Sequence, residues 1–183
     1  MVIVSRYRLV EKSSGNIFSV LSEECIPCPC CGEHLSSIGS RKRKYRKPTG
    51  DVIVLVIRRL RCGLCRRIHH ELPDMLVPYK RYGAASIEAV VCDGAGAAVA
   101  VDNSTVCRWL SWFSWAVEYM ANCLLVIAYR YGLSIDDSPY TCQFSRLIRF
   151  VGNAPGWLSR SVRSVANSNL WVHTRSAFVS TVR

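Results

Sequence analysis

Acidic residues are scarce in this sequence, with 13 Asp and Glu against 24 Lys and Arg in 183 residues. The formal net charge is therefore +11 at pH 7, and a balance of this sign favours a polyanionic partner such as nucleic acid. The sequence also lacks a Ser/His/Asp arrangement, a glycine-rich phosphate loop and a His-Glu metal motif, so we do not expect an enzyme. Internal repeats and low-complexity tracts are absent, which excludes a repeat architecture.

The first residues lack the uninterrupted apolar stretch of a secretory signal, because Arg6 follows the short run Met1–Ser5. We therefore expect the protein to remain in a reducing cytosol. In that compartment its ten cysteines are expected to be free thiols or metal ligands instead of disulfides.

Two Cys-x-x-Cys pairs are the most specific signal in the chain. Cys28 and Cys31 form the first pair, and Cys62 and Cys65 form the second. The chain between them, residues 36–57, contains a basic stretch, a turn and a β-branched strand, so it is expected to form a hairpin that returns the two pairs to each other. Four converging thiolates make the tetrahedral site that Zn²⁺ prefers. The pattern predicts a zinc ribbon with these four cysteines as ligands; four cysteines that bind nothing are the alternative.

Each pair is expected to lie in a tight turn, where Gly32 and Gly63 tolerate backbone angles that other residues resist. His69 and His70 follow the second pair, in a proline-containing stretch over residues 68–79 that we interpret as an ordered linker. Metal ligation by these histidines is one alternative. A contact to backbone or phosphate is more typical, because four cysteines already fill a structural site.

The basic charge is concentrated in the first half of the chain. Residues 1–83 hold 16 Lys and Arg against 7 Asp and Glu, whereas residues 84–183 hold 8 against 6. The densest part is the basic run at residues 41–47. A run of this kind is usually a solvated charged face. Here the run lies on the arm of a predicted metal-stabilised hairpin, which favours a surface for a polyanion. The predicted DNA contacts in this half are Arg41, Lys42, Arg43, Lys44, Lys47, Lys80 and Arg81.

A helix-turn-helix pattern follows the ribbon. Residues 86–92 have the periodicity of a short amphipathic helix, which Gly94 is expected to end. Residues 95–101 leave room for a second short helix, and the polar cluster at 102–105 is expected to cap a longer one. An ordinary helical hairpin is the alternative. The predicted DNA contacts at the start of the longer helix are Asn103, Ser104, Thr105 and Arg108.

This helix is expected to continue to about residue 131. Its apolar part is long enough to span a bilayer, but Ser111, Ser114, Glu118 and Asn122 form one polar stripe along it. We therefore interpret it as a mostly buried core helix and expect no membrane contact. Further helices are predicted over residues 143–151, 157–165 and 170–182, with a loop at 134–139.

Together these patterns predict an α+β fold, with an N-terminal β-rich zinc ribbon followed by a helix-turn-helix and an α-helical C-terminal region. The zinc ribbon with its basic β-hairpin is expected to occupy residues 1–78. The helix-turn-helix and the long core helix are expected over residues 79–131, and the helical C-terminal region over residues 132–183.

Three stretches, residues 28–32, 58–74 and 104–109, resemble small uncharacterised bacterial zinc-ribbon/helix-turn-helix proteins. Those proteins are in turn similar to the N-terminal DNA-binding region of insertion-sequence transposases. The resemblance implies zinc at the four cysteines and DNA contact from the helix that starts near Asn103. It does not imply DNA cutting. A transposase needs a catalytic domain with three spaced, metal-binding carboxylates, and the chain is too short for one.

The expected function is therefore that of a zinc-dependent DNA-binding protein, either a sequence-specific regulator or a transposase-like mobile-element accessory factor. A protein-interaction adaptor that docks to a larger transposase or polymerase is the alternative. The expected partners are DNA and either a second copy of the chain or a transposase-type protein, with no membrane. A cytoplasmic location at the bacterial nucleoid is expected.

Overall fold

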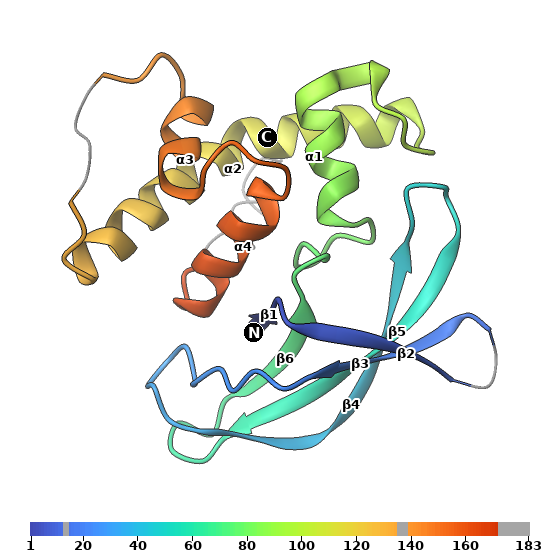
Figure 1. The fold of residues 1–183 in the computed structure, drawn as a ribbon, viewed down its shortest axis with the longest axis vertical. Helices are drawn as coiled ribbons and strands as arrows, with labels where there is room; N and C mark the ends of the chain where they lie inside the picture. The colour runs from blue at the N-terminus through green and yellow to red at the C-terminus, as the bar shows by residue number, and fades with distance from the viewer. Residues whose placement is uncertain (13–14, 135–138, 172–183) are drawn as a thin grey trace, which may run out of the picture.

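The protein is a mixed α+β structure with a curled sheet and four α-helices among the residues described by the computed structural model, 1–12, 15–134 and 139–171 (Figure 1). The predicted helix over 170–182 and the predicted loop at 134–139 lie mostly outside these residues. The strands are β1 (Val2–Val4), β2 (Tyr7–Lys12), β3 (Ile17–Ser22), β4 (Leu35–Arg46), β5 (Val52–Cys62) and β6 (Ile68–Pro73). The helices are α1 (Ala84–Asp93), α2 (Asn103–Arg130), α3 (Gln143–Val151) and α4 (Trp157–Asn167).

Strand β5 is the centre of the sheet. It pairs with β4 in an antiparallel hairpin along its full length, as the sequence predicts. On its other side it pairs with β3 through residues 54–56 and with β6 through residues 59–61, so the sheet bends around it. The run of β-branched residues suits a strand with neighbours on both sides. Alternate residues Ile53, Leu55 and Ile57 are 5%, 0% and 1% exposed and form the sheet side of the core.

Strand β6 corrects the prediction of a linker over residues 68–79. Residues 68–73 pair with β5 on one side and with β1 on the other, and Pro73 is tolerated because it is the last residue of the strand. Arg58 of β5 donates two hydrogen bonds of 2.7 and 2.6 Å to the buried carboxylate of Glu71 in β6. This bidentate pair fixes β6 against β5 beside the cysteine pairs.

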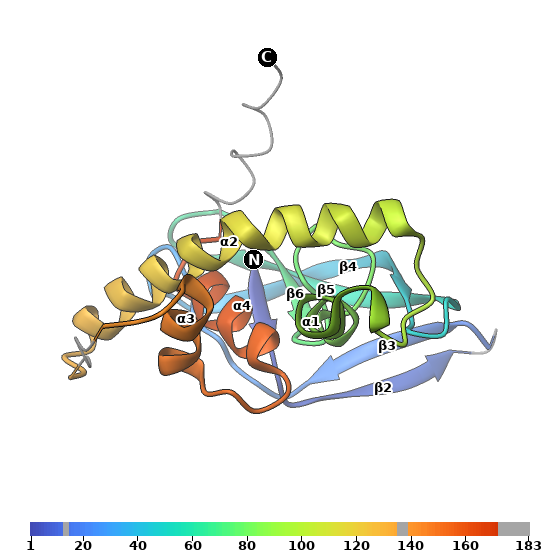
Figure 2. The same ribbon diagram turned by 90° about the horizontal axis from the view of Figure 1, so that it is seen from above.

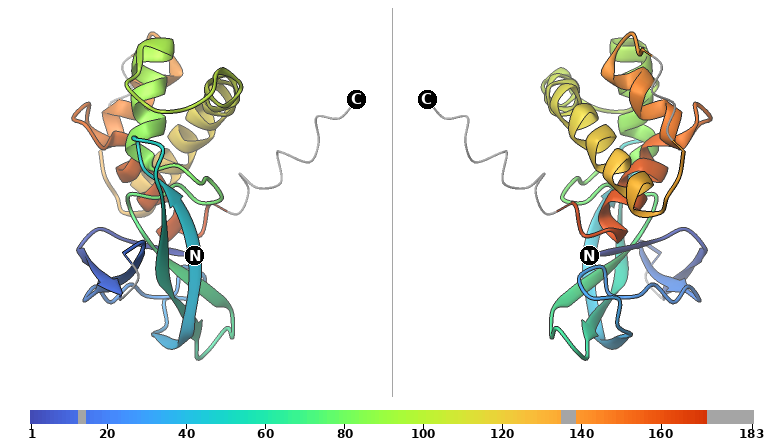
Figure 3. Two further views of the ribbon diagram at one scale, coloured as in Figure 1. Left: turned by 90° about the vertical axis from the view of Figure 1, so that its right-hand side faces the viewer. Right: turned by 90° about the vertical axis from the view of Figure 1, so that its left-hand side faces the viewer.

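The helices gather at one end of the molecule and the sheet lies at the other (Figures 1 and 3). Seen from above, α2 runs alongside α1, α4 and α3 (Figure 2). Helix α2 begins at Asn103, because the carboxylate of Asp102 accepts a hydrogen bond of 2.7 Å from the amide of Thr105. The predicted polar stripe of α2 is exposed, and its other side is buried against neighbouring helices, as expected for a core helix. Helix α3 has the predicted bounds, and α4 extends two residues beyond the predicted end.

One hydrophobic cluster joins the two ends. It contains Leu55 and Ile57 from the sheet together with Ile87 of α1, Met120 of α2 and Leu158 of α4, all at most 1% exposed. These residues come from each of the three predicted segments. The long hairpin is therefore packed onto the helices at one end, while its other end holds a second, smaller cluster around Cys28 and Cys62.

The connection between α1 and α2 differs from the helix-turn-helix prediction. Residues 94–96 form one 3₁₀ turn and residues 97–102 are not helical, so the predicted second short helix is wrong. A helix-turn-helix motif joins its helices by a turn of about three to four residues. The nine-residue connection here, 94–102, is longer. Gly94 ends α1 with φ of 59°, as predicted.

Glu88 of α1 is the buried group that attaches α4 to the rest of the fold. Its carboxylate accepts hydrogen bonds of 2.6 Å from the amide of Gly156 and 3.0 Å from the amide of Leu158. We expect Glu88→Ala to lower the free energy of unfolding by about 2–3 kcal/mol, because two amides at the start of α4 lose a charged acceptor. Denaturant titration measures the change. The control Glu118→Ala removes an exposed carboxylate from α2 and should change the free energy of unfolding by no more than about 0.5 kcal/mol.

Candidate metal centre and basic cleft

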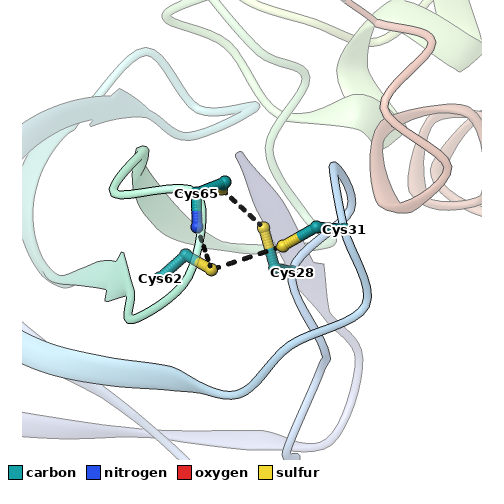
Figure 4. Close-up of side chains that lie close together, drawn as sticks. All are labelled: Cys28, Cys31, Cys62 and Cys65. Carbon is teal, nitrogen blue, oxygen red and sulfur yellow. Dashed lines mark hydrogen bonds between the residues drawn. The ribbon is translucent and has the colours of Figure 1, made fainter.

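The four predicted cysteines lie together at the end of the sheet that the helices do not cover. Their sulfur atoms are all within 4.8 Å of one another (Figure 4). The Sγ atoms of Cys28 and Cys65 are 3.6 Å apart, and those of Cys31 and Cys62 are 3.4 Å apart. A tetrahedral zinc with bonds of about 2.3 Å to sulfur separates its ligands by about 3.8 Å. The four thiols can therefore hold one metal ion with small movements.

The first turn of the site, around Cys28 and Cys31, is closed by backbone hydrogen bonds. The amide of Gly32 donates to the carbonyl of Cys28, and the amide of Cys28 donates to the carbonyl of Glu33, both at 2.8 Å. Gly32 has φ of 81°, in the left-handed region that glycine tolerates. The predicted role of Gly32 is therefore confirmed.

The second turn repeats this geometry with a different residue. Gly63 does not have a positive φ, so its predicted role is wrong. The left-handed position is Arg66, with φ of 60°, which follows Cys65 as Gly32 follows Cys31. The amide of Cys65 donates to the sulfur of Cys62 at 3.4 Å. Burial raises the pKa of the Cys62 thiol, but hydrogen bonds from the backbone and from neighbouring thiols outweigh burial and bring this pKa to about 7. Cys62 thus tends toward the thiolate, which is the metal-binding form.

His69 lies beside the cysteine cluster and is 3% exposed. Its Nδ1 is 3.0 Å from the Met1 ammonium, and its Nε2 is 3.4 Å from the sulfur of Cys28. Burial, and then the charge of that ammonium, lower the pKa of His69 to about 4, so the ring is neutral. A neutral ring that accepts at Nδ1 carries its proton on Nε2 and donates it toward Cys28. His69, Cys28 and Cys30 also form a second group of donors within 4.8 Å of one another.

A basic cleft lies between β4 and residues 78–81, with a volume of about 710 Å³. The two stretches meet because the Arg46 amide donates to the Arg81 carbonyl at 2.9 Å. His70 also lines the cleft, whereas His69 lies beside the cysteine cluster, so the two adjacent histidines lie at different sites. The basic residues that line the cleft are Arg41, Lys42, Arg43, Lys44, Lys80 and Arg81. Six of the seven basic residues predicted as DNA contacts in the first half of the chain are thus brought together.

The basic run of β4 is divided between the two faces of the strand. Arg41 and Arg43 stand opposite buried Ile57 and Leu55 of β5, on the face toward the core. Lys42 and Lys44 point to the other face and are exposed. The seventh residue, Lys47, is half-buried in the turn after β4.

Arg43 is half-buried and has a structural contact. Its guanidinium donates hydrogen bonds of 3.2 Å to the carbonyl of Val77 and 2.8 Å to the carbonyl of Lys80. Burial, and then the neighbouring charge of Arg41, lower its pKa. Arg43 thus holds residues 77–80 against β4, and its role as a DNA contact stays a prediction.

Lys80 connects the cleft to the start of α2. Its ammonium lies 4.5 Å from the centre of the Trp112 ring, a cation–π contact. Burial, and then the charge of Arg108, lower the pKa of Lys80 to about 8. The predicted DNA-contacting turn of α2 is therefore close enough to the cleft for the two to act on one ligand.

The first turn of α2 differs from the prediction at Thr105. This side chain is 7% exposed and its hydroxyl donates to Asp102, so Thr105 serves as part of the helix cap and is not available to DNA. Asn103 and Ser104 are exposed. The guanidinium of Arg108 folds back onto its own helix, with hydrogen bonds of 2.8 Å to Thr105 Oγ1 and 3.1 Å to the Ser104 carbonyl. Base contact by Arg108 requires the release of these bonds and stays a prediction.

Tyr79 is the cleft residue that sequence reasoning missed. It is 56% exposed and lines the cleft between Pro78 and Lys80. The local sequence Tyr79–Tyr82 places two basic residues between two aromatic ones, which is a signal for nucleic-acid binding that was available from the sequence.

A family model described as a domain of unknown function (DUF6431) matches residues 28–109. The matched stretch contains all four cysteines, the β4–β5 hairpin, the basic cleft except Met1, and the first turns of α2. No curated protein and no solved structure matches the chain.

Proposed function

We propose that this protein is a zinc-dependent DNA-binding protein in which a zinc ribbon supports the basic cleft. The observation that supports this most is the convergence of residues 41–44 with residues 80–81 on one cleft, although they are far apart in the sequence. Cationic side chains grouped around a concave surface attract phosphates and raise their local concentration.

Zinc fits the donor set of the proposed ribbon. Four cysteine sulfurs are the ligands of closed structural zinc sites, which leave no position for a substrate. The ion would connect the turn before β4 to the end of β5. It would thereby fix the hairpin whose other end forms the cleft. Its role would be structural, and we propose no reaction at it.

The proposed biological role is that of a sequence-specific regulator or a transposase-like mobile-element accessory factor, in the cytoplasm at the bacterial nucleoid. Cationic residues of the cleft would contact phosphates and position the protein on DNA. The start of α2 would supply base contacts through Asn103, Ser104 and Arg108, as the reading helix of a helix-turn-helix with a long connection. The nearness of Arg108 to Lys80 supports a joint surface.

A titration of the zinc-loaded protein with labelled duplex DNA at several salt concentrations tests this function. We expect the logarithm of the association constant to fall linearly with the logarithm of salt concentration, with a slope of about −4 to −5 if most of the cationic cleft residues contact phosphates. Selection from a random DNA pool would then give the preferred site. Absence of DNA binding at low salt, together with capture of a transposase or polymerase, would favour the adaptor function instead.

A further inference from the structure

Tyr79 has an unusual backbone conformation for its size. Its φ is 65°, in the left-handed region where a bulky residue is rare. Such positions persist where the surroundings fix them, and they cluster at functional sites. In this protein, hydrogen bonds on either side of Tyr79 fix its conformation. The Lys80 amide donates to the Val77 carbonyl at 3.1 Å, and Arg43 donates to the carbonyls of Val77 and Lys80, so the turn is held on both sides of Tyr79.

The fixed turn presents an aromatic ring to the cleft. The side chain of Tyr79 is 56% exposed, while Tyr45 of β4 is 8% exposed and belongs to the core. A tyrosine that served only to pack in the core would be buried as Tyr45 is, and it would not need a constrained turn to hold it at the surface. The exposed ring and the surrounding cations therefore form one surface.

The chemistry of this surface fits an unpaired nucleotide. The cleft volume of about 710 Å³ is within the range of about 300–1,000 Å³ that takes small organic molecules. Proteins that bind single strands combine a basic groove for the backbone with aromatic rings on which bases stack. The phosphates of a duplex could contact the cationic side chains. The bases of a duplex are already stacked on each other, so none of them could stack on the ring of Tyr79.

We propose that the cleft binds single-stranded DNA, with a base stacked on Tyr79 and the adjoining phosphates on Arg41 and Arg81. This inference rests on the proposed DNA binding and specifies which form of DNA the cleft takes. Arg43 is a positioning residue in it, because it fixes the turn that carries the ring. Duplex DNA would contact the outer cations and the start of α2.

The test compares the zinc-loaded full chain with Tyr79→Ala and Tyr79→Phe, using a labelled oligothymidylate and a labelled duplex. We expect Tyr79→Ala to weaken binding of the single strand about tenfold, since stacking on one ring supplies about 1–3 kcal/mol per base. Duplex affinity should change less than twofold, and Tyr79→Phe should retain single-strand binding. Tyr131→Ala, which removes a 71% exposed ring at the end of α2, is the matched control and should bind both as the wild type does.

A second readout is the fluorescence of a 2-aminopurine placed in the strand, which stacking on Tyr79 should quench in the wild type and in Tyr79→Phe but not in Tyr79→Ala. Unchanged single-strand affinity of Tyr79→Ala, while the wild type still binds duplex in a salt-dependent manner, would overturn this inference and leave the proposed function standing. Equal loss on both DNA forms would also overturn it. Failure of the wild type to bind either form would instead remove the proposed function.

Discussion

Replacement of Cys62 by serine is expected to abolish stoichiometric metal binding and to unfold the sheet around the cysteine cluster. The side chain of Cys62 is fully buried, and its sulfur lies 3.4 Å from the sulfur of Cys31 and accepts a hydrogen bond from the amide of Cys65. Structural zinc supplies about 10–16 kcal/mol to small zinc-binding folds, which equals or exceeds the whole stability of a typical domain. Elemental analysis should find one zinc per wild-type chain and much less than one in Cys62→Ser, with loss of the cooperative thermal transition.

The matched control for this experiment is Cys92→Ser, which removes an exposed thiol near the end of α1. It should retain one zinc and the wild-type melting temperature. A chelator added to the wild-type protein should reproduce the effect of Cys62→Ser, because both remove the same ion. Wild-type protein prepared without chelator that holds no stoichiometric zinc would contradict the ribbon.

The cysteine cluster was predictable from the sequence because its geometry is local. A Cys-x-x-Cys turn brings two sulfurs together within four residues, and the hairpin between the pairs is itself a local structure. The two turns nevertheless use different left-handed residues, Gly32 and Arg66. Sequence composition favours glycine at such a position and gives no reason to expect arginine there.

Strands β1 and β6 were not predictable in the same way. Val2 pairs with Glu71, a parallel contact between residues 69 positions apart, which leaves no local signature. The sequence of β6 does not alternate between polar and apolar residues, and although most of the strand is buried it carries the polar run His69-His70-Glu71 instead of an apolar one. Its closing proline resembles a linker signal more than a strand end.

The basic run of β4 shows why a charge pattern predicts a charged surface but not which of its residues are exposed on that surface. A bulge between Ser37 and Gly39 shifts the register of β4 against β5. Such a shift decides which face each following side chain takes. Arg43 therefore points toward the core side and holds a turn, whereas its neighbours Lys42 and Lys44 remain in solvent. The cleft itself depends on residues 78–81 folding back onto β4, which is a tertiary contact.

The double variant Lys42→Ala/Lys44→Ala is expected to weaken binding to all DNA sequences alike. Both side chains are exposed on β4, at the border of the cleft. Each phosphate that a lysine neutralises contributes about 0.9 to the salt slope. Loss of two contacts should therefore flatten the slope by about two and reduce affinity by about 60-fold at 0.1 M salt. Titration of selected and scrambled duplexes at several salt concentrations measures both quantities.

The double variant Arg8→Ala/Lys12→Ala is the matched control, because it removes the same two charges from exposed positions on β2. β2 lies at an end of the strand order on the opposite side of β5 from β4, so its charges do not line the cleft. Its salt slope should match that of the wild type, and its affinity should fall less than about threefold through the change in net charge. If the two double variants weaken binding equally, then overall charge attracts DNA and β4 is not the contact surface. If Lys42→Ala/Lys44→Ala loses affinity for the selected duplex alone, then these lysines contact bases and not phosphates.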